Sequence, residues 1–141
     1  MLRLLLLDFL PRSADAGLLL LRVWLGLSLL LLHGLAKLKG FSEMSSKFPD
    51  PLGVGSPASL GMAIFAEVVC SVLITLGLFT RFAATVLAIT MATAFFLVHK
   101  MALSGPSSGE LAFIYLAGFV ALLIAGGGRF AIDAKLGGRG R

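Results

Sequence analysis

The chain has 141 residues, of which 58% are hydrophobic and 13% are charged, and its formal net charge is +5. Soluble domains average about 45–50% apolar and 25% charged residues, so this composition excludes an ordinary soluble domain and indicates a membrane protein. The Lys and Arg residues stand singly at the ends of apolar segments, without interleaved aromatics, which argues against nucleic acid as a partner. The single cysteine, Cys70, excludes an internal disulfide and a C-x-x-C redox pair.

Residues 1–12 come first and hold only four leucines between Arg3 and Asp8. That run is too short for the core of a cleaved signal peptide, so we expect an interfacial segment that stays on the protein. Four apolar segments follow, at about residues 14–36, 59–79, 82–103 and 111–125. Their lengths suit membrane-spanning helices, because lipid offers no hydrogen-bond partners to an open backbone. The sequence therefore predicts an all-α membrane protein, an antiparallel four-helix transmembrane bundle that forms a single transmembrane domain over residues 1–141.

The basic residues outside the spans indicate the orientation. With the N-terminus inside, seven lie on the cytoplasmic side and four on the other: Arg3, Arg12, Arg81, Arg129, Lys135, Arg139 and Arg141 against Lys37, Lys39, Lys47 and Lys100. Cytoplasmic loops carry the excess of Lys and Arg, so we expect a multi-pass inner-membrane protein with both termini cytoplasmic. Arg81 and Arg129 are assigned as topology residues, and Thr80-Arg81 as a tight hairpin between spans two and three.

Two charges, Arg22 and Glu67, lie well away from the ends of the spans. Arg22 is roughly 10 Å from the cytoplasmic end of span one and Glu67 roughly 20 Å from that end of span two, at about 1.5 Å per residue. An ionisable group at that depth is costly and suggests a functional site. A long arginine side chain covers much of the difference, so the sequence predicts an Arg22–Glu67 ion pair. Two interpretations stay open, a working pair and a structural pair that only fixes helix register.

Further polar residues mark the predicted outer half. Together with the two buried charges they form a candidate ligand-binding polar pocket, which comprises Arg22, His33, Lys37, Glu67, His99 and Glu110. The competing interpretation is that the histidines are polar tips at the interface and that the lysines are interface anchors. No residue is assigned a catalytic role.

Several site types are excluded by spacing. The two histidines share no carboxylate at ligand spacing, so no metal site is expected. Gly126-Gly127-Gly128 follows no strand and lacks an acidic residue about twenty positions on, which excludes a dinucleotide fingerprint.

Three stretches resemble the DoxX family of small four-helix membrane proteins. They are RVWLGLSLLLLHGLAKL from Arg22, AEVVCSVLITLGLFTRFAA from Ala66, and GELAFIYLAG with GGGRFAID between Gly109 and Asp133, with His99 in span three. The resemblance implies a bacterial inner-membrane protein associated with membrane redox complexes, among them thiosulfate:quinone oxidoreductase in a related branch. It does not imply a reaction.

The leading hypothesis is an accessory subunit of a quinone-linked redox complex, with a polar pocket that accepts a quinone or a lipid head group. Its expected partners are the bilayer and either other membrane or peripheral redox subunits or further copies of the chain. Two alternatives stay open, a structural or assembly factor and a small transporter.

Overall fold

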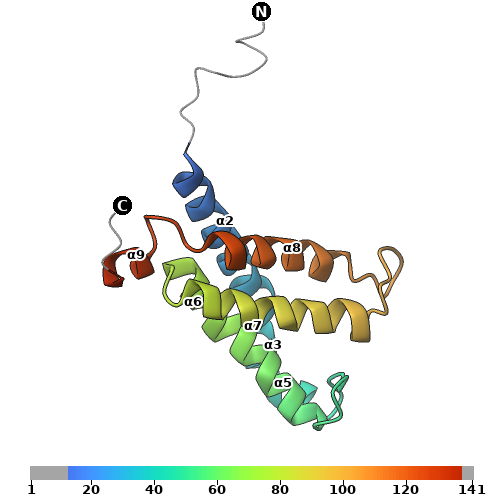
Figure 1. Cartoon of the computed structure of the whole chain (residues 1–141). Coiled ribbons are helices and arrows are strands. Elements are labelled where there is room, and N and C mark those ends of the chain that lie inside the picture. Colours follow the sequence, from blue (N-terminus) through green and yellow to red (C-terminus); the bar gives the residue numbers. More distant parts are fainter. Residues whose placement is uncertain (1–12, 138–141) are drawn as a thin grey trace, which may run out of the picture.

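A computed structural model describes residues 13–137, and within that range every regular element is a helix (Figure 1). The predicted interfacial segment, residues 1–12, lies outside the described residues. The elements, with π-helical turns written η, are α2 (Ala14–Leu29), η1 (Leu30–Gly34), α3 (Leu35–Lys39), α4 (Phe41–Met44), α5 (Ser56–Ile64), η2 (Phe65–Cys70), α6 (Ser71–Leu76), α7 (Thr80–Thr93), η3 (Ala94–Val98), α8 (Glu110–Ala125) and α9 (Ile132–Leu136). The all-helical prediction is confirmed.

Three continuous helices are long and apolar enough to cross a membrane. They run over Ala14–Lys39, Ser56–Leu76 and Thr80–Val98, close to the first three predicted spans. The fourth predicted span is the 16-residue helix α8. At about 1.5 Å per residue it extends roughly 24 Å, less than the roughly 30 Å of a hydrocarbon core. Crossing by α8, and with it the four-span bundle, therefore stays a prediction.

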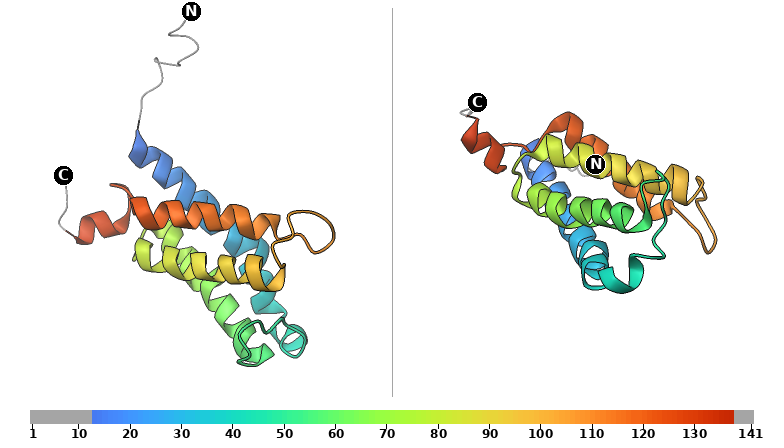
Figure 2. Two further views of the ribbon diagram at one scale, coloured as in Figure 1. Left: turned by 45° about the vertical axis from the view of Figure 1, so that its right-hand side comes forward. Right: turned by 90° about the horizontal axis from the view of Figure 1, so that it is seen from below.

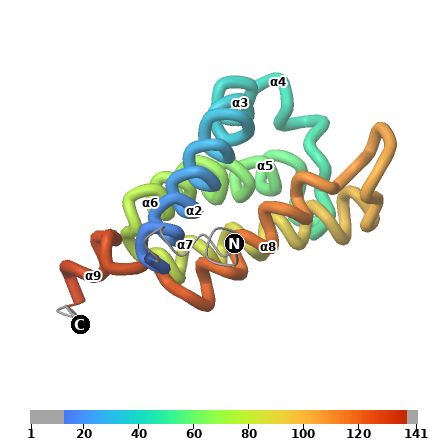
Figure 3. Tube along the Cα trace, turned by 90° about the horizontal axis from the view of Figure 1, so that it is seen from above, coloured from blue at the N-terminus to red at the C-terminus, as the bar shows by residue number. Residues whose placement is uncertain are grey.

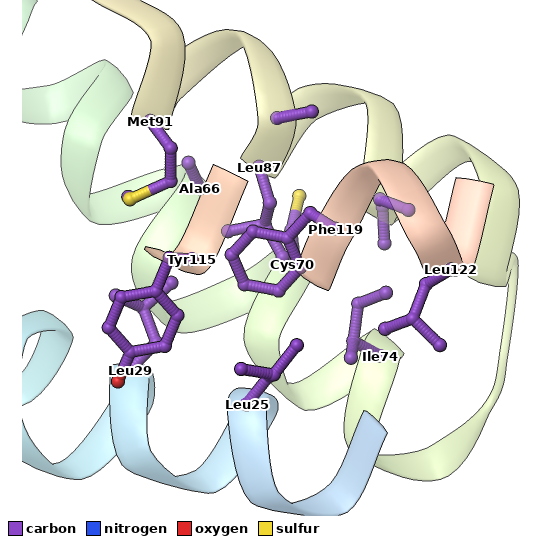
Figure 4. Packing of buried hydrophobic residues seen from close by; sticks show 13 residues of the cluster. Leu25, Leu29, Ala66, Cys70, Ile74, Leu87, Met91, Tyr115, Phe119 and Leu122 are labelled. Atoms are coloured by element: carbon purple, nitrogen blue, oxygen red, sulfur yellow. The ribbon is translucent and has the colours of Figure 1, made fainter. Parts of the chain in front are cut away.

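Two antiparallel helix pairs make up the molecule. The α2 helix packs on α6, and α7 packs along α8. Figure 1 and the left view of Figure 2 show the α7/α8 pair running obliquely across the first pair. Figure 1 also shows the segment after α3 and the start of α5 together at one end of the molecule, and the tube in Figure 3 shows α2 and α3 alongside α6 and α5. The core between the pairs is apolar, and Figure 4 shows Leu29, Cys70, Leu87 and Phe119 converging on it.

Two glycines set the register of the first pair. A Cβ on Gly26 would lie 2.8 Å from the Ser71 carbonyl oxygen, and one on Gly34 would lie 2.5 Å from that of Glu67. Only glycine permits such an approach of two backbones, as at many helix contacts in membranes. Span one is thereby fixed against span two, with Gly26 beside the turn from Ser71 to Thr75 and Gly34 beside Glu67.

The turn between α6 and α7 is as tight as the sequence predicts, but it lies at residues 77–79, because Thr80 and Arg81 already form the first turn of α7. Gly77 ends α6 with φ 70°, and Phe79 also takes a left-handed conformation, with φ 48°. A left-handed residue at the end of a helix is commonly glycine because the conformation strains a Cβ. At Phe79 the backbone is held by a hydrogen bond from its N–H to the distant carboxylate of Asp133.

Candidate functional site

A pocket of about 870 Å³ lies between α5 with η2 on one side and α7 with η3 on the other, and the segment 48–52 contributes to its wall. Most of its lining is apolar. The polar or charged residues that line it are Lys37, Ser59, Glu67, Thr90, Thr93 and His99. A volume of this size suits a small molecule, since ligand sites in proteins usually measure about 300–1,000 Å³.

An ion pair forms the charged part of this pocket. Lys37 Nζ donates a hydrogen bond to Glu67 Oε2 at 2.6 Å, and the two side chains are only 18% and 7% exposed. The pairing satisfies both charges away from water, where either alone would be costly. Lys37 keeps two further ammonium protons that can bind a ligand.

The expected Arg22–Glu67 ion pair is not formed, and this is a correction. The glycine contacts place Glu67 beside Gly34, twelve residues beyond Arg22 along span one. Twelve residues of helix extend about 18 Å, farther than an arginine side chain can reach. Lys37, which lies about one turn beyond Gly34, is the cation that pairs with Glu67.

Two π-helical turns line the pocket, and a third lies close to it in the sequence. The lining turns are η2 and η3, and η1 ends three residues before Lys37. A π-turn widens the helix locally and re-aims the side chains that follow, and such turns are frequent at functional sites. Glu67 lies in η2 and lines the pocket, and it is the one charged residue of this turn.

His99 reaches the pocket from the end of η3. Its Nδ1 lies 2.9 Å from the carbonyl oxygen of Ser107. A carbonyl oxygen only accepts, so Nδ1 is the donor of this bond, and the neutral tautomer with this donor has Nε2 as an acceptor. The following residues, Lys100 and Met101, have φ of 50° and 62°, which ends the helix there and not at the predicted residue 103.

Arg22 lies at the other end of the molecule, where its guanidinium joins three segments. It is 2% exposed, and it donates to the carbonyls of Thr75 at 2.7 Å and Phe130 at 2.8 Å. The Ile74 carbonyl accepts a longer bond of 3.4 Å. Cations are favoured where a helix presents its last carbonyls, as α6 does here. Arg22 therefore connects span one to the end of span two and to the segment after α8.

Asp133 supplies the opposite charge at the same turn. Its carboxylate accepts hydrogen bonds from the backbone N–H groups of Phe79 at 2.7 Å and Thr80 at 2.8 Å, so it caps the start of α7. Burial alone would raise the pKa of Asp133, but these bonds and the charge of Arg22 outweigh it and hold that pKa below its ordinary value of 3.8. The ionised form is thus favoured by the fold.

Replacement of Asp133 by asparagine is expected to lower the free energy of unfolding at neutral pH by about 1–2 kcal/mol, because an amide has one acceptor oxygen where the carboxylate has two and carries no charge, so one of the two bonds to the start of α7 is lost. Because the folded pKa is depressed, the contribution of Asp133 is complete above about pH 4 and is lost as the pH falls through the lower folded value. Unfolding in mixed micelles at a series of acidic pH values measures this. Asp133→Asn should lose less stability on acidification than the wild type, and equal losses in both would contradict the capping role.

The remaining predicted site residues do not line the pocket. The His33 ring packs edge to face on Tyr115 with centroids 6.3 Å apart. Glu110 is exposed in the first turn of α8. The structure thus brings together Lys37, Glu67 and His99, and it places Arg22, His33 and Glu110 elsewhere.

The topology residues Arg81 and Arg129 lie at the Arg22 end of the molecule. Arg81 donates to the Ile124 carbonyl at 3.2 Å near the end of α8. Arg129 lies 3.7 Å from Asp15 in an exposed ion pair.

Two pocket features escaped the sequence reasoning. Ser59 is buried and its hydroxyl donates to Asp50 at 2.7 Å, which ties the loop before α5 to the pocket wall. A carboxylate in a Pro- and Gly-rich loop just before a helix is a signal that could have identified Asp50 as a capping residue.

Outside the pocket, the role of Asp133 had no comparable signal in the sequence, because its hydrogen-bond partners are 53 and 54 residues away. Within residues 13–137 no three His, Cys, Asp or Glu side chains gather to hold a metal ion.

Comparisons with known proteins bear on the same residues. The family model described as DoxX matches residues 17–100, a range that includes the Lys37–Glu67 pair and His99 and ends before α8. An uncharacterized protein of Haemophilus influenzae is 40% identical over 111 aligned residues, which cover 74% of this chain and 80% of the relative. No solved structure matches the chain.

Proposed function

The chain belongs to the DoxX family, and from this premise and the geometry of its pocket we propose that it is an inner-membrane, quinone-binding accessory subunit of a membrane redox complex. The observation that carries the proposal is a large, mostly apolar pocket with a buried lysine–glutamate pair in its wall. Family membership supports a location in the membrane, and the residues that line the pocket support a ligand that is mostly apolar with a polar head group.

A quinone head group matches the pocket in both shape and polarity. Its ring is flat and apolar, and the apolar side chains of α5 and α7 offer a surface for it. Its two carbonyl oxygens need donors, and the Lys37 ammonium supplies a charged one. The Nε2 of His99 is suited to accept from the hydroxyl of the reduced quinol, so the pocket offers groups to both redox forms.

Glu67 supports Lys37 in this proposal and gives the pair a path for protons. It is a carboxylate in direct hydrogen-bond contact with the ammonium that would face the quinone. Reduction of a quinone to a quinol consumes two protons, so a titratable pair beside the ring is chemically appropriate. The proposed role is accessory because Cys70 is the single cysteine of the chain, and dithiol exchange therefore requires another subunit.

The proposed orientation keeps both termini in the cytoplasm. The end of the molecule that holds the turn between α6 and α7 would then face the cytoplasm, together with Arg81, Arg129 and Lys135. The pocket, near the loop with Lys39 and Lys47, would lie in the outer half of the bilayer. The excess of basic residues on the first side supports this orientation.

Quinone binding tests the proposal directly. The protein in lipid nanodiscs is titrated with a short-tailed benzoquinone, and binding is followed by equilibrium dialysis. Lys37→Met and Glu67→Gln are each expected to weaken binding at least tenfold, or about 1.4 kcal/mol. Lys39→Met is the matched control, since Lys39 is exposed and lies two residues further on. Wild-type affinity in a folded Lys37→Met protein, checked by circular dichroism, would sink the proposal.

A further inference from the structure

We propose that the pocket opens sideways into the bilayer between α5 and α7, so that its ligand is a long-tailed amphiphile whose tail lies in this opening. The inference rests on the proposed quinone site and adds to it the route of entry and the class of quinone. Three features of the described residues support it: the side that faces lipid, the side that is closed, and a glycine at the opening.

The lipid-facing side carries exposed apolar side chains on both edges of the pocket. Met62 and Phe65 on one edge are 48% and 46% exposed, and Ile89 on α7 is 62% exposed. All three belong to helices of membrane-spanning length, so their exposed faces meet hydrocarbon and not water. Figure 1 shows that α5 and α7 diverge with distance from the tight turn that joins the two spans, and the pocket lies between these two helices. The α7 helix packs on α6 and η2 instead.

The loop side is closed by the segment 48–52, which the Asp50 carboxylate fastens to the start of α5. Asp50 accepts from the Ser59 hydroxyl at 2.7 Å, from the Gly55 N–H at 2.8 Å and from the Val54 N–H at 3.1 Å. The hydrogen bonds from Ser59 and Gly55 hold the pKa of Asp50 below its ordinary value, so the latch is ionised and intact at neutral pH. Pro49 and Pro51 restrict the same segment further. The segment 48–52 therefore restricts access to the pocket from the loop side, whereas the side between α5 and α7 faces the hydrocarbon of the bilayer.

The polarity of the pocket orients such a ligand. Lys37 lies near the end of the helix Ala14–Lys39, close to the membrane surface, and offers a charged partner to a head group. The edges at Met62, Phe65 and Ile89 offer only apolar contact to whatever extends from it. A ligand whose head group binds at the ion pair and whose hydrocarbon tail extends between α5 and α7 matches both the charged part and the apolar edges of the pocket.

Gly61 keeps this opening clear. It lines the pocket, is exposed, and a Cβ built on it meets no atom within 4 Å. A large side chain can therefore be added there without a clash and would occupy the space assigned to the tail. Gly17 on α2 offers a matched control, because it too is an exposed helical glycine with nothing within 4 Å of its Cβ, and it lies outside the pocket.

The experiment compares a benzoquinone of one isoprenoid unit with one of eight units, each at the same mole fraction in nanodiscs. We expect Gly61→Phe to weaken binding of the long-tailed quinone at least tenfold and to change binding of the short-tailed one less than threefold. Gly17→Phe should bind both as the wild type does. Equal binding of the long-tailed quinone by Gly61→Phe and wild type would overturn the lateral opening. So would an equal loss of both compounds, which would place residue 61 over the head group.

Failure of the quinone assignment gives a different pattern. If neither quinone binds the wild type, native mass spectrometry of the gently extracted protein asks whether a phospholipid is retained. A phospholipid that is retained by wild type and Gly17→Phe but lost from Gly61→Phe supports the opening and removes the quinone. Identical lipid retention by all three proteins overturns the opening.

Discussion

Replacing Arg22 by methionine is expected to lower the free energy of unfolding by about 3 kcal/mol or more, the largest effect of any single substitution considered for this chain. Methionine keeps most of the apolar volume but donates no hydrogen bond. The carbonyls of Thr75 and Phe130 then lose a charged donor at 2.7 and 2.8 Å. Each hydrogen bond to a charged group contributes about 1.5–3 kcal/mol, and the cost of burying the cation offsets part of the total.

The loss should also appear as local separation of the C-terminal segment. The Phe130 carbonyl accepts from Arg22, whereas Asp133 is bound to the turn through Gly77, Phe79 and Thr80, so removal of the guanidinium takes away one of the two attachments of the C-terminal segment. Hydrogen exchange at residues 130–136 measures this alongside unfolding in mixed micelles. Arg22→Lys should recover only part of the stability, because an ammonium lacks the fork that reaches two carbonyls on different segments.

The control for Arg22 is Arg129→Met at the same end of the molecule. Arg129 has a side chain that is 70% exposed and a long ion pair to Asp15 at 3.7 Å, so its loss should cost well below about 1 kcal/mol. Equal stability of the Arg22→Met and Arg129→Met proteins would show that the buried guanidinium does not join the three segments.

The second large effect concerns the Lys37–Glu67 pair, where each single substitution should be worse than the double one. Lys37→Met leaves a carboxylate that is 7% exposed without its cation, and Glu67→Leu leaves the ammonium without its anion. Breaking a buried pair from one side costs about 3–5 kcal/mol; the 18% exposure of Lys37 reduces this to about 2–4. Replacing both by apolar residues leaves no unpaired charge, so Lys37→Met/Glu67→Leu should unfold within about 1 kcal/mol of the wild type.

The double variant also separates stability from function. If the pair binds a quinone, the double variant should be stable and should fail to bind it. A stable double variant that supports full activity of the proposed redox complex would favour the structural or assembly role that the sequence left open. The two roles are distinguished by measuring denaturant unfolding and quinone binding by dialysis on four proteins: the wild type, Lys37→Met, Glu67→Leu and the double variant. A double variant less stable than both single variants would contradict the ion-pair account.

The family and the helical class of the chain were accessible from the sequence because they depend on local and ordered features. Apolar runs of span length predicted helices, and the short motifs around Arg22, Glu67 and His99 predicted the DoxX family, which the comparison confirms. A tight connection between spans two and three was also predicted, since so few residues separate the two apolar segments, but its position was predicted two to three residues too late: residues 77–79 form the turn and Thr80-Arg81 begin α7.

The partner of Glu67 was not accessible in the same way. Depth estimates from the ends of two spans are uncertain by several residues, and an error of one or two turns exchanges one cation for another. Gly26 and Gly34 decide the matter, because the two backbones meet at these residues and fix which level of span one faces Glu67. The sequence contains both glycines but does not state which residues of span two they meet.

By itself, then, the sequence determined that this chain is helical, suited to lipid, and carries charges that must be satisfied inside its spans. Only the tertiary structure decided how they are satisfied. Lys37 pairs with Glu67 at the pocket, while Arg22 binds carbonyls at the opposite end, beside the cap that Asp133 places on α7. The physical reason is that burial of a charge demands a partner, a requirement visible in composition, whereas the identity of that partner depends on helix register and side-chain reach in three dimensions.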